Sequence, residues 1–282
     1  MTFFRNMTHE DIASGLMLCR YAGWNQVSED WQIFLDLNPT GCRVAFDEAG
    51  KVVGTVTTIS YDDHFSWIGM VLVLPEKQRQ AIGTQLLMEA LQLLSNQSTV
   101  KLDATPAGRN VYLKLNFVDE YRINRMHHDG NSFQPFPPSS VRAMLDTDFP
   151  DVFKLDCKVF GADRRGVLER NYKRAPKYAL VAEAKGQISG FCFGRPGYNF
   201  DQIGPVIAQR FEEAHNLLLG ALSQAQRKPI IVDAPDHSPA WTEFLSALGF
   251  VVQRPFIRMY RGSNSHPGVP AHQFAITGPE FG

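Results

Sequence analysis

The chain has 282 residues, of which 44% are hydrophobic, and its formal net charge is -1 at pH 7. At about 150 residues per domain, this length favours two domains. The near-neutral charge gives no electrostatic reason to expect nucleic acid or an anionic membrane as a partner. No apolar run reaches the roughly 18 residues of a membrane span, and acidic residues interrupt the N-terminus where a secretory signal is apolar. We therefore expect a cytoplasmic protein.

The four cysteines predict reduced thiols rather than a metal site. They are far apart in the sequence, form no CxxC pair and have no neighbouring histidine: Cys19, Cys42, Cys157 and Cys192. This spacing is typical of mostly buried thiols in a reducing compartment. We expect no bound metal.

Apolar periodicity predicts an alternating α/β order in the first half. The expected elements are a strand at 2–6, helices at 9–22 and 28–37, a hairpin at 42–60, a strand at 66–74, a helix at 82–95, a strand at 99–104, a helix at 107–115 and strands to about 128. The stretch 128–140 (HDGNSFQPFPPSS) is rich in Pro, Ser, Gly and Asn, which predicts a linker.

The second half repeats this order. We expect helices at 147–159 and 163–173, a hairpin at 178–194, a strand at 201–207, a helix at 208–225, a strand at 230–234, a helix at 238–248 and a strand at 251–261. Short phrases recur in order, such as Leu102-Asp103-Ala104 and Val232-Asp233-Ala234. A tandem repeat is therefore expected, with domains 1–130 and 131–262. The tail, 263–282, has little periodicity and is expected on the surface or disordered.

The junction between the strand at 66–74 and the following helix is the first candidate site. A loop that opens a helix presents unpaired backbone N–H groups at the positive end of the helix dipole, which suits an anion. Ala81, Gly83 and Thr84 are small enough to let a phosphate approach, and Arg79 adds a cation. Gly83 is also expected to supply backbone angles closed to other residues. The alternative is a tight turn with ordinary helix packing.

The motif Gln78-x-x-Ala81-x-Gly83, after an apolar strand ending in Val73-Leu74-Pro75, resembles the acyl-CoA loop of the GNAT N-acetyltransferases. The resemblance continues through the helix 107–117, with its Tyr-x-x-x-x-Phe ending, and covers about residues 1–128. The second half carries FGADR and RPFIRMYRG, which resemble a tandem-GNAT group. The resemblance implies an α/β (α+β) fold of two modules, each a mixed, mostly antiparallel sheet flanked by helices. It also implies acetyl-CoA as acyl donor.

The resemblance assigns roles to three sets of residues. Backbone groups of Val71, Leu72 and Val73 would bind the pantetheine amides, as a sheet edge binds a strand. The pyrophosphate would lie at the loop that contains Gln78, Arg79, Gln80, Ala81, Ile82, Gly83 and Thr84. Tyr112 would be the general acid that protonates the departing thiolate, although it could instead pack on its helix. A backbone N–H near Val73 would stabilise the oxyanion.

The general base and the acceptor pocket stay open in the sequence. The strand at 66–74 holds no acid, and five residues near the site loops are candidates: Glu29, Asp62, Asp63, His64 and Asp103. Trp24-Asn25 and Trp31 could shape an acceptor pocket or belong to the core.

The second half lacks both functional features of the first. Aligned through the helix leucines, Glu212 replaces Ala81 and Glu213 follows it, so two carboxylates would repel a pyrophosphate. Tyr112 aligns with Leu245 or its neighbour. We therefore expect the second half to cover or shape the acceptor site, with the turn Gly194–Tyr198 as a candidate to reach it.

These observations predict an acetyl-CoA-dependent N-acetyltransferase that acts on a primary amine at one site in the first half. The alternative is a non-catalytic acyl-CoA-binding or regulatory protein with the same fold. A small-molecule acceptor is favoured over a protein lysine, with no nucleic-acid or membrane partner and a monomer or homodimer. A fragment 1–130 is expected to keep some cofactor binding.

Overall fold

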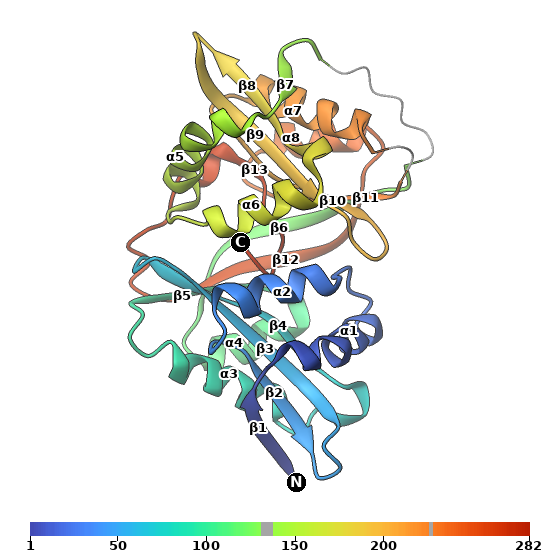
Figure 1. Ribbon diagram of the computed structural model, residues 1–282, viewed down its shortest axis with the longest axis vertical. Helices are drawn as coiled ribbons and strands as arrows, with labels where there is room; N and C mark the ends of the chain where they lie inside the picture. The colour runs from blue at the N-terminus through green and yellow to red at the C-terminus, as the bar shows by residue number, and fades with distance from the viewer. Residues whose placement is uncertain (131–137, 226–227) are drawn as a thin grey trace.

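In a computed structural model the strands of the described residues, 1–130, 138–225 and 228–282, form one continuous sheet. Its order is β1-β2-β3-β4-β5-β12-β6-β11-β10-β9-β8-β7, and β13 pairs with β10. Helices cover the sheet in two groups, one for each half of the chain (Figure 1). The predicted mixed, mostly antiparallel α/β architecture is confirmed.

The elements of the first half follow the sequence prediction closely. They are β1 (Thr2–Asn6), α1 (Ile12–Tyr21), α2 (Ser28–Leu37), β2 (Arg43–Asp47), β3 (Val52–Tyr61), β4 (Phe65–Val73), α3 (Ile82–Leu93), β5 (Thr99–Ala104), α4 (Pro106–Lys114) and β6 (Val118–His128). The second half repeats the order with β7 (Val141–Ala143), α5 (Phe149–Phe160), α6 (Arg165–Arg174), β8 (Leu180–Ala184), β9 (Gln187–Arg195), β10 (Asp201–Ala208), α7 (Phe211–Ser223), β11 (Ile230–Pro235), α8 (Pro239–Ala247), β12 (Val251–Gly262) and β13 (Gln273–Ala275). Of the predicted linker, residues 131–137 lie outside the described part of the chain.

The two halves exchange their last long strands. β12, from the second half, lies between β5 and β6, with Ile257 opposite both Ala104 and Arg122. β6, from the first half, pairs on its other side with β11, where Met126 is opposite Val232. Because each half supplies a strand that covers an edge of the other, the hydrogen-bonded sheet runs through the whole chain.

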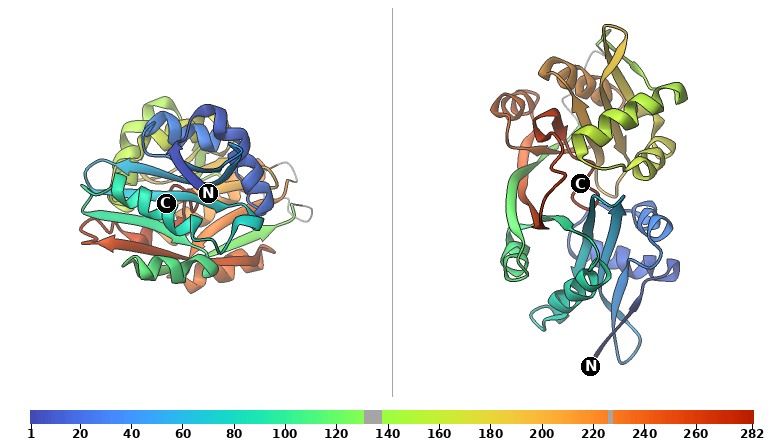
Figure 2. Two further views of the ribbon diagram at one scale, coloured as in Figure 1. Left: turned by 90° about the horizontal axis from the view of Figure 1, so that it is seen from below. Right: turned by 90° about the vertical axis from the view of Figure 1, so that its left-hand side faces the viewer.

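The last part of the tail, residues 273–282, is the element that the sequence prediction placed wrongly. Residues 263–272 lie at the surface, whereas residues 273–282 are buried apart from Pro279, and the chain ends between the two halves (Figure 2). The Phe281 side chain is fully buried and stacks on Phe34, with ring centroids 4.8 Å apart. The Tyr61 hydroxyl donates to the Phe281 carbonyl at 2.8 Å, and Trp67 Nε1 donates to the Pro279 carbonyl at 3.0 Å. Isolated anchors of this kind leave no periodicity in a sequence.

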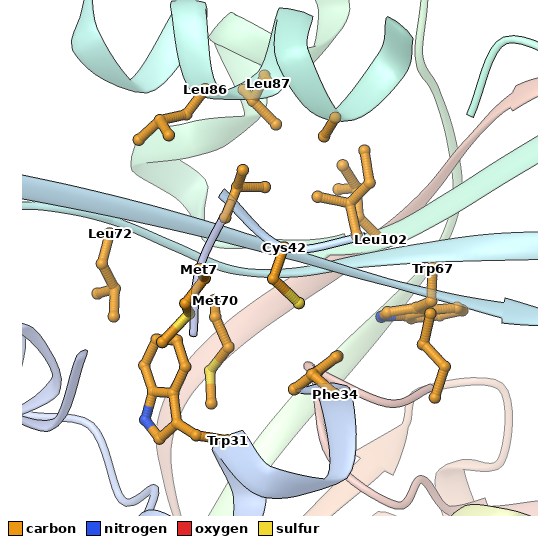
Figure 3. Close-up of a cluster of buried hydrophobic side chains, with 14 of the residues drawn as sticks. Met7, Trp31, Phe34, Cys42, Trp67, Met70, Leu72, Leu86, Leu87 and Leu102 are labelled. Atoms are coloured by element: carbon orange, nitrogen blue, oxygen red, sulfur yellow. The ribbon is translucent and has the colours of Figure 1, made fainter. Parts of the chain in front are cut away.

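The hydrophobic core of the first half contains Trp31, whose role the sequence left open, and Leu72. The Trp31 side chain is fully buried between β4 and the first helices, beside Met7 and Met70 (Figure 3). Leu72 also belongs to this buried cluster and is 5% exposed. Trp31 is therefore a core residue rather than a wall of the acceptor pocket. Leu72 lies opposite Thr55 of β3 and, unlike Val71 and Val73, does not line the groove beside β4.

The cysteines are free thiols, three of them buried and Cys157 partly exposed. Within the described ranges, no helix combines the length and the apolar character needed to cross a membrane.

Candidate active site

The strands β4 and β5 separate to open a cleft. They are parallel neighbours only at Ser66 opposite Val100 and Trp67 opposite Lys101. Further along β4 the pairing with β3 is irregular, and Met70 has a left-handed φ of 50°. Such a bulge bends a strand away from its neighbour. Beyond Trp67, the β4 edge that faces β5 therefore has no strand partner among the described residues.

A groove of about 410 Å³ occupies this separation. Its walls come from the end of β4, the loop before α3, and α4, with Val71 and Val73 on one side and Gly108 and Tyr112 on the other. Pockets for small ligands and cofactors commonly have volumes of about 300–1,000 Å³. The groove brings together almost every residue that the resemblance assigned to the donor, including Gln78, Arg79, Ala81, Ile82, Gly83 and Thr84.

The loop at the start of α3 presents free backbone donors. The structure gives the N–H groups of residues 79–84 no acceptor among the described residues, and the first bonded group is the Gln85 N–H, which donates to the Ala81 carbonyl at 2.9 Å. The left-handed residues are Arg79 (φ 62°) and Ala81 (φ 60°), not Gly83, so the prediction of special backbone angles at Gly83 is wrong. A Cβ atom at Gly83 would approach only Val73 Cγ2, at 3.5 Å, so its small size keeps the groove open.

Two glutamines of the loop have structural partners. The Gln78 Nε2 donates to the Val73 carbonyl at 3.3 Å, which ties the loop to the end of β4. The Gln80 Nε2 donates to the Glu76 carbonyl at 3.3 Å, and Gln80 does not line the groove. These side chains shape the loop and leave the backbone N–H groups to face an anion.

A second, smaller cavity of about 70 Å³ adjoins the groove. Both hollows are lined by Val71, Thr105 and Tyr112, so they meet at these residues. The other walls of the smaller cavity come from the loop between α1 and α2, from β4, β5 and the exchanged strands, and from the tail: Trp24, Gln26, Ile68, Gly69, Met70, Leu102, Asp103, Arg125, Arg254, Phe256, Pro279 and Glu280. It is the candidate acceptor pocket.

Tyr112 stands where the two hollows meet. Its side chain is half-buried, and burial raises the pKa of its phenol to about 12. A Cβ atom on Gly108 would lie 3.0 Å from Tyr112 Cε2, so this glycine makes room for the ring. The hydroxyl has no hydrogen bond to a described residue, and at neutral pH it carries the proton that a general acid needs.

Of the five candidate bases, only Asp103 lines the acceptor pocket. Both of its carboxylate oxygens accept hydrogen bonds from Arg258, at 2.8 Å each, and burial raises its pKa while Arg258 opposes that shift. Asp62 accepts from the Asp163 N–H, and His64 Nδ1 contacts the Gly161 carbonyl. Glu29 and Asp63 are exposed and lie outside the pocket lining. The structure therefore brings one of the five to the pocket.

Trp24 lines the acceptor pocket, which is one of the two roles that the sequence left open for it. Asn25 does not line the pocket and instead contacts the second half. The Asn25 Oδ1 accepts from the N–H groups of Asn199 and Phe200, at 2.8 and 3.0 Å. The predicted turn Gly194–Tyr198 reaches the first half, because the Arg20 guanidinium lies 3.5 Å over the Tyr198 ring. The turn does not line the acceptor pocket.

In the second half, the cleft that corresponds to the groove is filled by the chain itself. β10 pairs in parallel with β11 from Asp201 to Ile203, as β4 does with β5. Further along, where β4 has a free edge, β10 pairs with β13 of the tail, with Val206 opposite Ala275. The Ile276 N–H then donates to the Asp233 carbonyl of β11 at 3.0 Å. The tail thus occupies the place where the first half has its groove.

The start of α7 is also closed to an anion. The Glu213 carboxylate accepts hydrogen bonds from the Arg210 N–H at 3.2 Å and the Ser189 hydroxyl at 2.8 Å. Leu245 takes the place of Tyr112, since each is the seventh residue of its helix (α8 and α4), and it is fully buried.

Comparison with known proteins identifies the family. Residues 10–117 match the Acetyltransferase (GNAT) family, and residues 152–275 match the Acetyltransferase (GNAT) domain. The chain belongs to the GNAT acetyltransferases. The two matches place one GNAT domain in each half, so this GNAT chain is a tandem N-acetyltransferase.

Its relatives carry related names. The GNAT chain is 25% identical over 240 residues to "Holothin acyltransferase" of Pseudoalteromonas sp. (strain SANK 73390), which covers 85% of this chain and 81% of the relative. It is 24% identical over 247 residues to "Uncharacterized N-acetyltransferase YitH" of Bacillus subtilis (strain 168), with 86% of each chain covered.

Solved structures share the tandem architecture. A putative acetyltransferase from Pyrococcus horikoshii superposes with a TM-score of 0.82 at 26% identity, over 100% of this chain and 96% of that one. A tandem GNAT protein from the clavulanic acid biosynthesis pathway gives a TM-score of 0.62 at 14% identity, over 92% and 98% of the two chains, which shows the fold alone.

Sequence reasoning missed three charged residues of the GNAT acceptor pocket: Arg125, Arg254 and Glu280. Arg125 and Arg254 lie on the exchanged strands, and Glu280 comes from the tail. A Cβ atom on Gly69 would lie 2.9 Å from the Glu280 carbonyl oxygen, so this glycine of β4 admits the tail. The motif RPFIRMYRG contains Arg254, but the pocket appears only when β12 crosses into the first half.

Proposed function

We propose that this N-acetyltransferase transfers an acetyl group from acetyl-CoA directly to a primary amine, at one active site in the first half. The observation that carries the proposal is the contrast between the two clefts. The groove beside β4 is open and meets a buried pocket at Tyr112, whereas the cleft beside β10 is filled by β13.

The groove offers suitable groups along the length of the donor. The free edge of β4 at 71–73 presents backbone groups that can pair with the pantetheine amides in the manner of an added strand. The six N–H groups of residues 79–84, with the helix dipole and Arg79, suit the pyrophosphate. Both features support acetyl-CoA as the donor.

Acetyl transfer to an amine forms a C–N bond, breaks a C–S bond, and requires a proton for the departing sulfur. Tyr112 keeps its proton at neutral pH and lies where the groove meets the acceptor pocket, so we assign it that donation. A backbone N–H near Val73 would stabilise negative charge on the acyl oxygen. Glu280 or Asp103, directly or through water, would receive the proton of the amine.

The size of the acceptor pocket, about 70 Å³, favours a small-molecule amine over a lysine on a protein surface. The free thiols support a place in the reducing cytoplasm.

Calorimetric titration with acetyl-CoA tests the single site, and release of free CoA in the presence of an amine panel tests catalysis. We expect one acetyl-CoA per chain and amine-dependent CoA release. Two comparable sites per chain would refute the assignment to one half. Binding of acetyl-CoA without transfer to any amine would favour the non-catalytic alternative.

A further inference from the structure

Three buried polar atoms that have no hydrogen-bond partner among the described residues line the acceptor pocket. They are Gln26 Oε1, Arg254 Nε and Glu280 Oε2. Buried polar atoms are almost always paired, because an unpaired one costs about 1–3 kcal/mol. Three such atoms around a single cavity are available as hydrogen-bond partners for a ligand.

The chemistry of these atoms describes the ligand. Gln26 and Glu280 each present an oxygen that accepts a hydrogen bond, and an amine or ammonium group supplies such donors. The other oxygen of Glu280 is already paired with Arg195. Arg254 is a cation and a donor, and it prefers a carboxylate or phosphate. The cavity thus suits a ligand with an N–H group and an anionic group together.

The charges around the pocket leave one cation uncompensated. Arg125 is paired with Asp233 at 2.7 Å, and Arg258 is paired with Asp103 at 2.8 Å. Arg195 lies between Asp30 and Glu280, and Arg174 also pairs with Asp30 at 2.7 Å.

Arg254 has neither an ion pair nor a hydrogen bond to any described residue. Burial, and then the neighbouring Arg125, lower the pKa of its guanidinium to about 10. The guanidinium groups of Arg125 and Arg254 each lie 5.1 Å from the centre of the Phe256 ring. A ligand carboxylate would offset the cost of burying this charge.

We propose that the acceptor is a small amine that carries a carboxylate, an amino acid-type substrate, with its carboxylate on Arg254 and its amine at Glu280 and Gln26. This inference rests on the proposed N-acetyltransferase function and names its substrate class. An amino acid in the free-amine form that can attack carries one negative charge, which matches the uncompensated positive charge of Arg254. A polyamine would instead place positive charge beside Arg254.

The cavity volume sets the scale of the substrate. At about 70 Å³ the cavity is small beside the roughly 300–1,000 Å³ of a common ligand pocket. We therefore expect amino acids with small side chains to be better acceptors than aromatic ones.

The test is a CoA-release assay on matched pairs that differ only in the carboxylate: glycine and glycinamide, alanine and alaninamide, β-alanine and β-alaninamide. Spermidine and tyramine serve as amines without a carboxylate. Rates are compared at equal concentrations of free amine, because amides and acids differ in amine pKa. We expect kcat/KM to be at least tenfold higher for the acid in at least one pair.

The variant Arg254→Gln should lower kcat/KM for that acid by at least tenfold, mainly through KM, and affect its amide much less. Arg254→Lys should restore part of the loss. Arg261→Gln removes the same charge from the same strand outside the pocket lining, and should leave both rates unchanged. Because Arg254 makes no ion pair or hydrogen bond with a described residue and contacts only the Phe256 ring, its replacement should change the melting temperature little.

A second measurement does not depend on turnover. In the presence of saturating CoA, the accepted amino acid should raise the melting temperature of the wild-type protein but not that of Arg254→Gln. Equal rates for acid and amide, or an acid rate unaffected by Arg254→Gln, would overturn the inference. So would the absence of both turnover and stabilisation with every carboxylate-bearing amine. Transfer to spermidine or tyramine alone would overturn the inference but leave the proposed function intact, whereas failure to bind acetyl-CoA would refute the function itself.

Discussion

The clefts of the two halves share a backbone plan but differ in what fills them. In each, a strand pairs in parallel with the next strand for two or three residues and then separates from it. The gap beside β4 is a groove of about 410 Å³, whereas the gap beside β10 receives β13. The fold therefore provides a place for an added strand in each half. The tail fills the place beside β10, so only the place beside β4 is available to a ligand.

The helix starts differ in the same sense. At α7, the Glu213 carboxylate accepts a hydrogen bond from the Arg210 N–H and lies at the favourable end of the dipole. At α3, the N–H groups of residues 79–84 have no acceptor in the described part of the chain, and Arg79 and Ala81 adopt left-handed angles that cost about 1–3 kcal/mol each in a non-glycine residue. The start of α3 thus keeps local strain that the described start of α7 lacks, as is common where a site must bind a ligand.

The largest predicted effect concerns the independence of the halves. A fragment 1–130 lacks β12, which pairs with β5 and β6, and β11, which pairs with β6. We expect the fragment to aggregate or to unfold without cooperativity, because it exposes strand edges and apolar surface. The structure thus removes the basis for expecting this fragment to bind cofactor. Circular dichroism melting checks the prediction, and a soluble fragment with a sharp transition and acetyl-CoA affinity would contradict it.

Gly83→Glu tests the open groove. The side chain fits sterically, since a Cβ atom would approach only Val73 Cγ2 at 3.5 Å, but it places a carboxylate at the anion loop. We expect acetyl-CoA affinity to fall by at least a hundredfold, with little change in melting temperature. Calorimetric titration measures the affinity. The matched control is Glu212→Gly, which removes a carboxylate at the α7 start and should leave one site of normal affinity. Unchanged binding in Gly83→Glu would mean that the loop is misassigned.

Tyr112→Phe tests the residue that Leu245 replaces in the second half. The variant keeps the ring and removes the hydroxyl, so acetyl-CoA affinity should stay near the wild-type value. If the phenol protonates the departing sulfur, kcat should fall at least tenfold. Because burial raises the pKa of Tyr112 to about 12, the phenol stays protonated below that pH. The wild-type rate should therefore not fall through loss of this proton up to about pH 11. An unchanged kcat would assign Tyr112 to packing.

Glu213→Ala tests the closed cleft and should have the smallest effect. The change removes the acceptor for the Arg210 N–H and the Ser189 hydroxyl, so the free energy of unfolding should fall by about 1–2 kcal/mol. It should create no second acetyl-CoA site, because β13 still pairs with β10. Denaturant unfolding and titration measure the two quantities. A second site in this variant would show that the carboxylate, rather than β13, closes the cleft.

The sequence by itself determined the elements and the anion loop, because both depend on neighbours along the chain. The predicted helix at 28–37 and strand at 99–104 coincide with α2 and β5, and the Gln78–Gly83 motif lies in the groove. One local detail differs: the predicted helix at 9–22 is a short 3-10 turn at His9–Asp11 followed by α1. Apolar period and loop composition are local signals, so they survive without knowledge of the fold.

Only the tertiary structure decided which strands pair and what enters the acceptor pocket. The exchange of β6 and β12 leaves no mark on periodicity, because strand pairing is made by backbone groups that every residue carries. The tail is held by isolated aromatic side chains and by hydrogen bonds to its carbonyl groups, such as the one that the Tyr61 hydroxyl donates to the Phe281 carbonyl. These contacts have no regular spacing. Arg254 reaches the pocket through the strand exchange, and Glu280 reaches it through the docking of the tail. Their proposed shared role in binding the acceptor therefore has no local signature in the sequence.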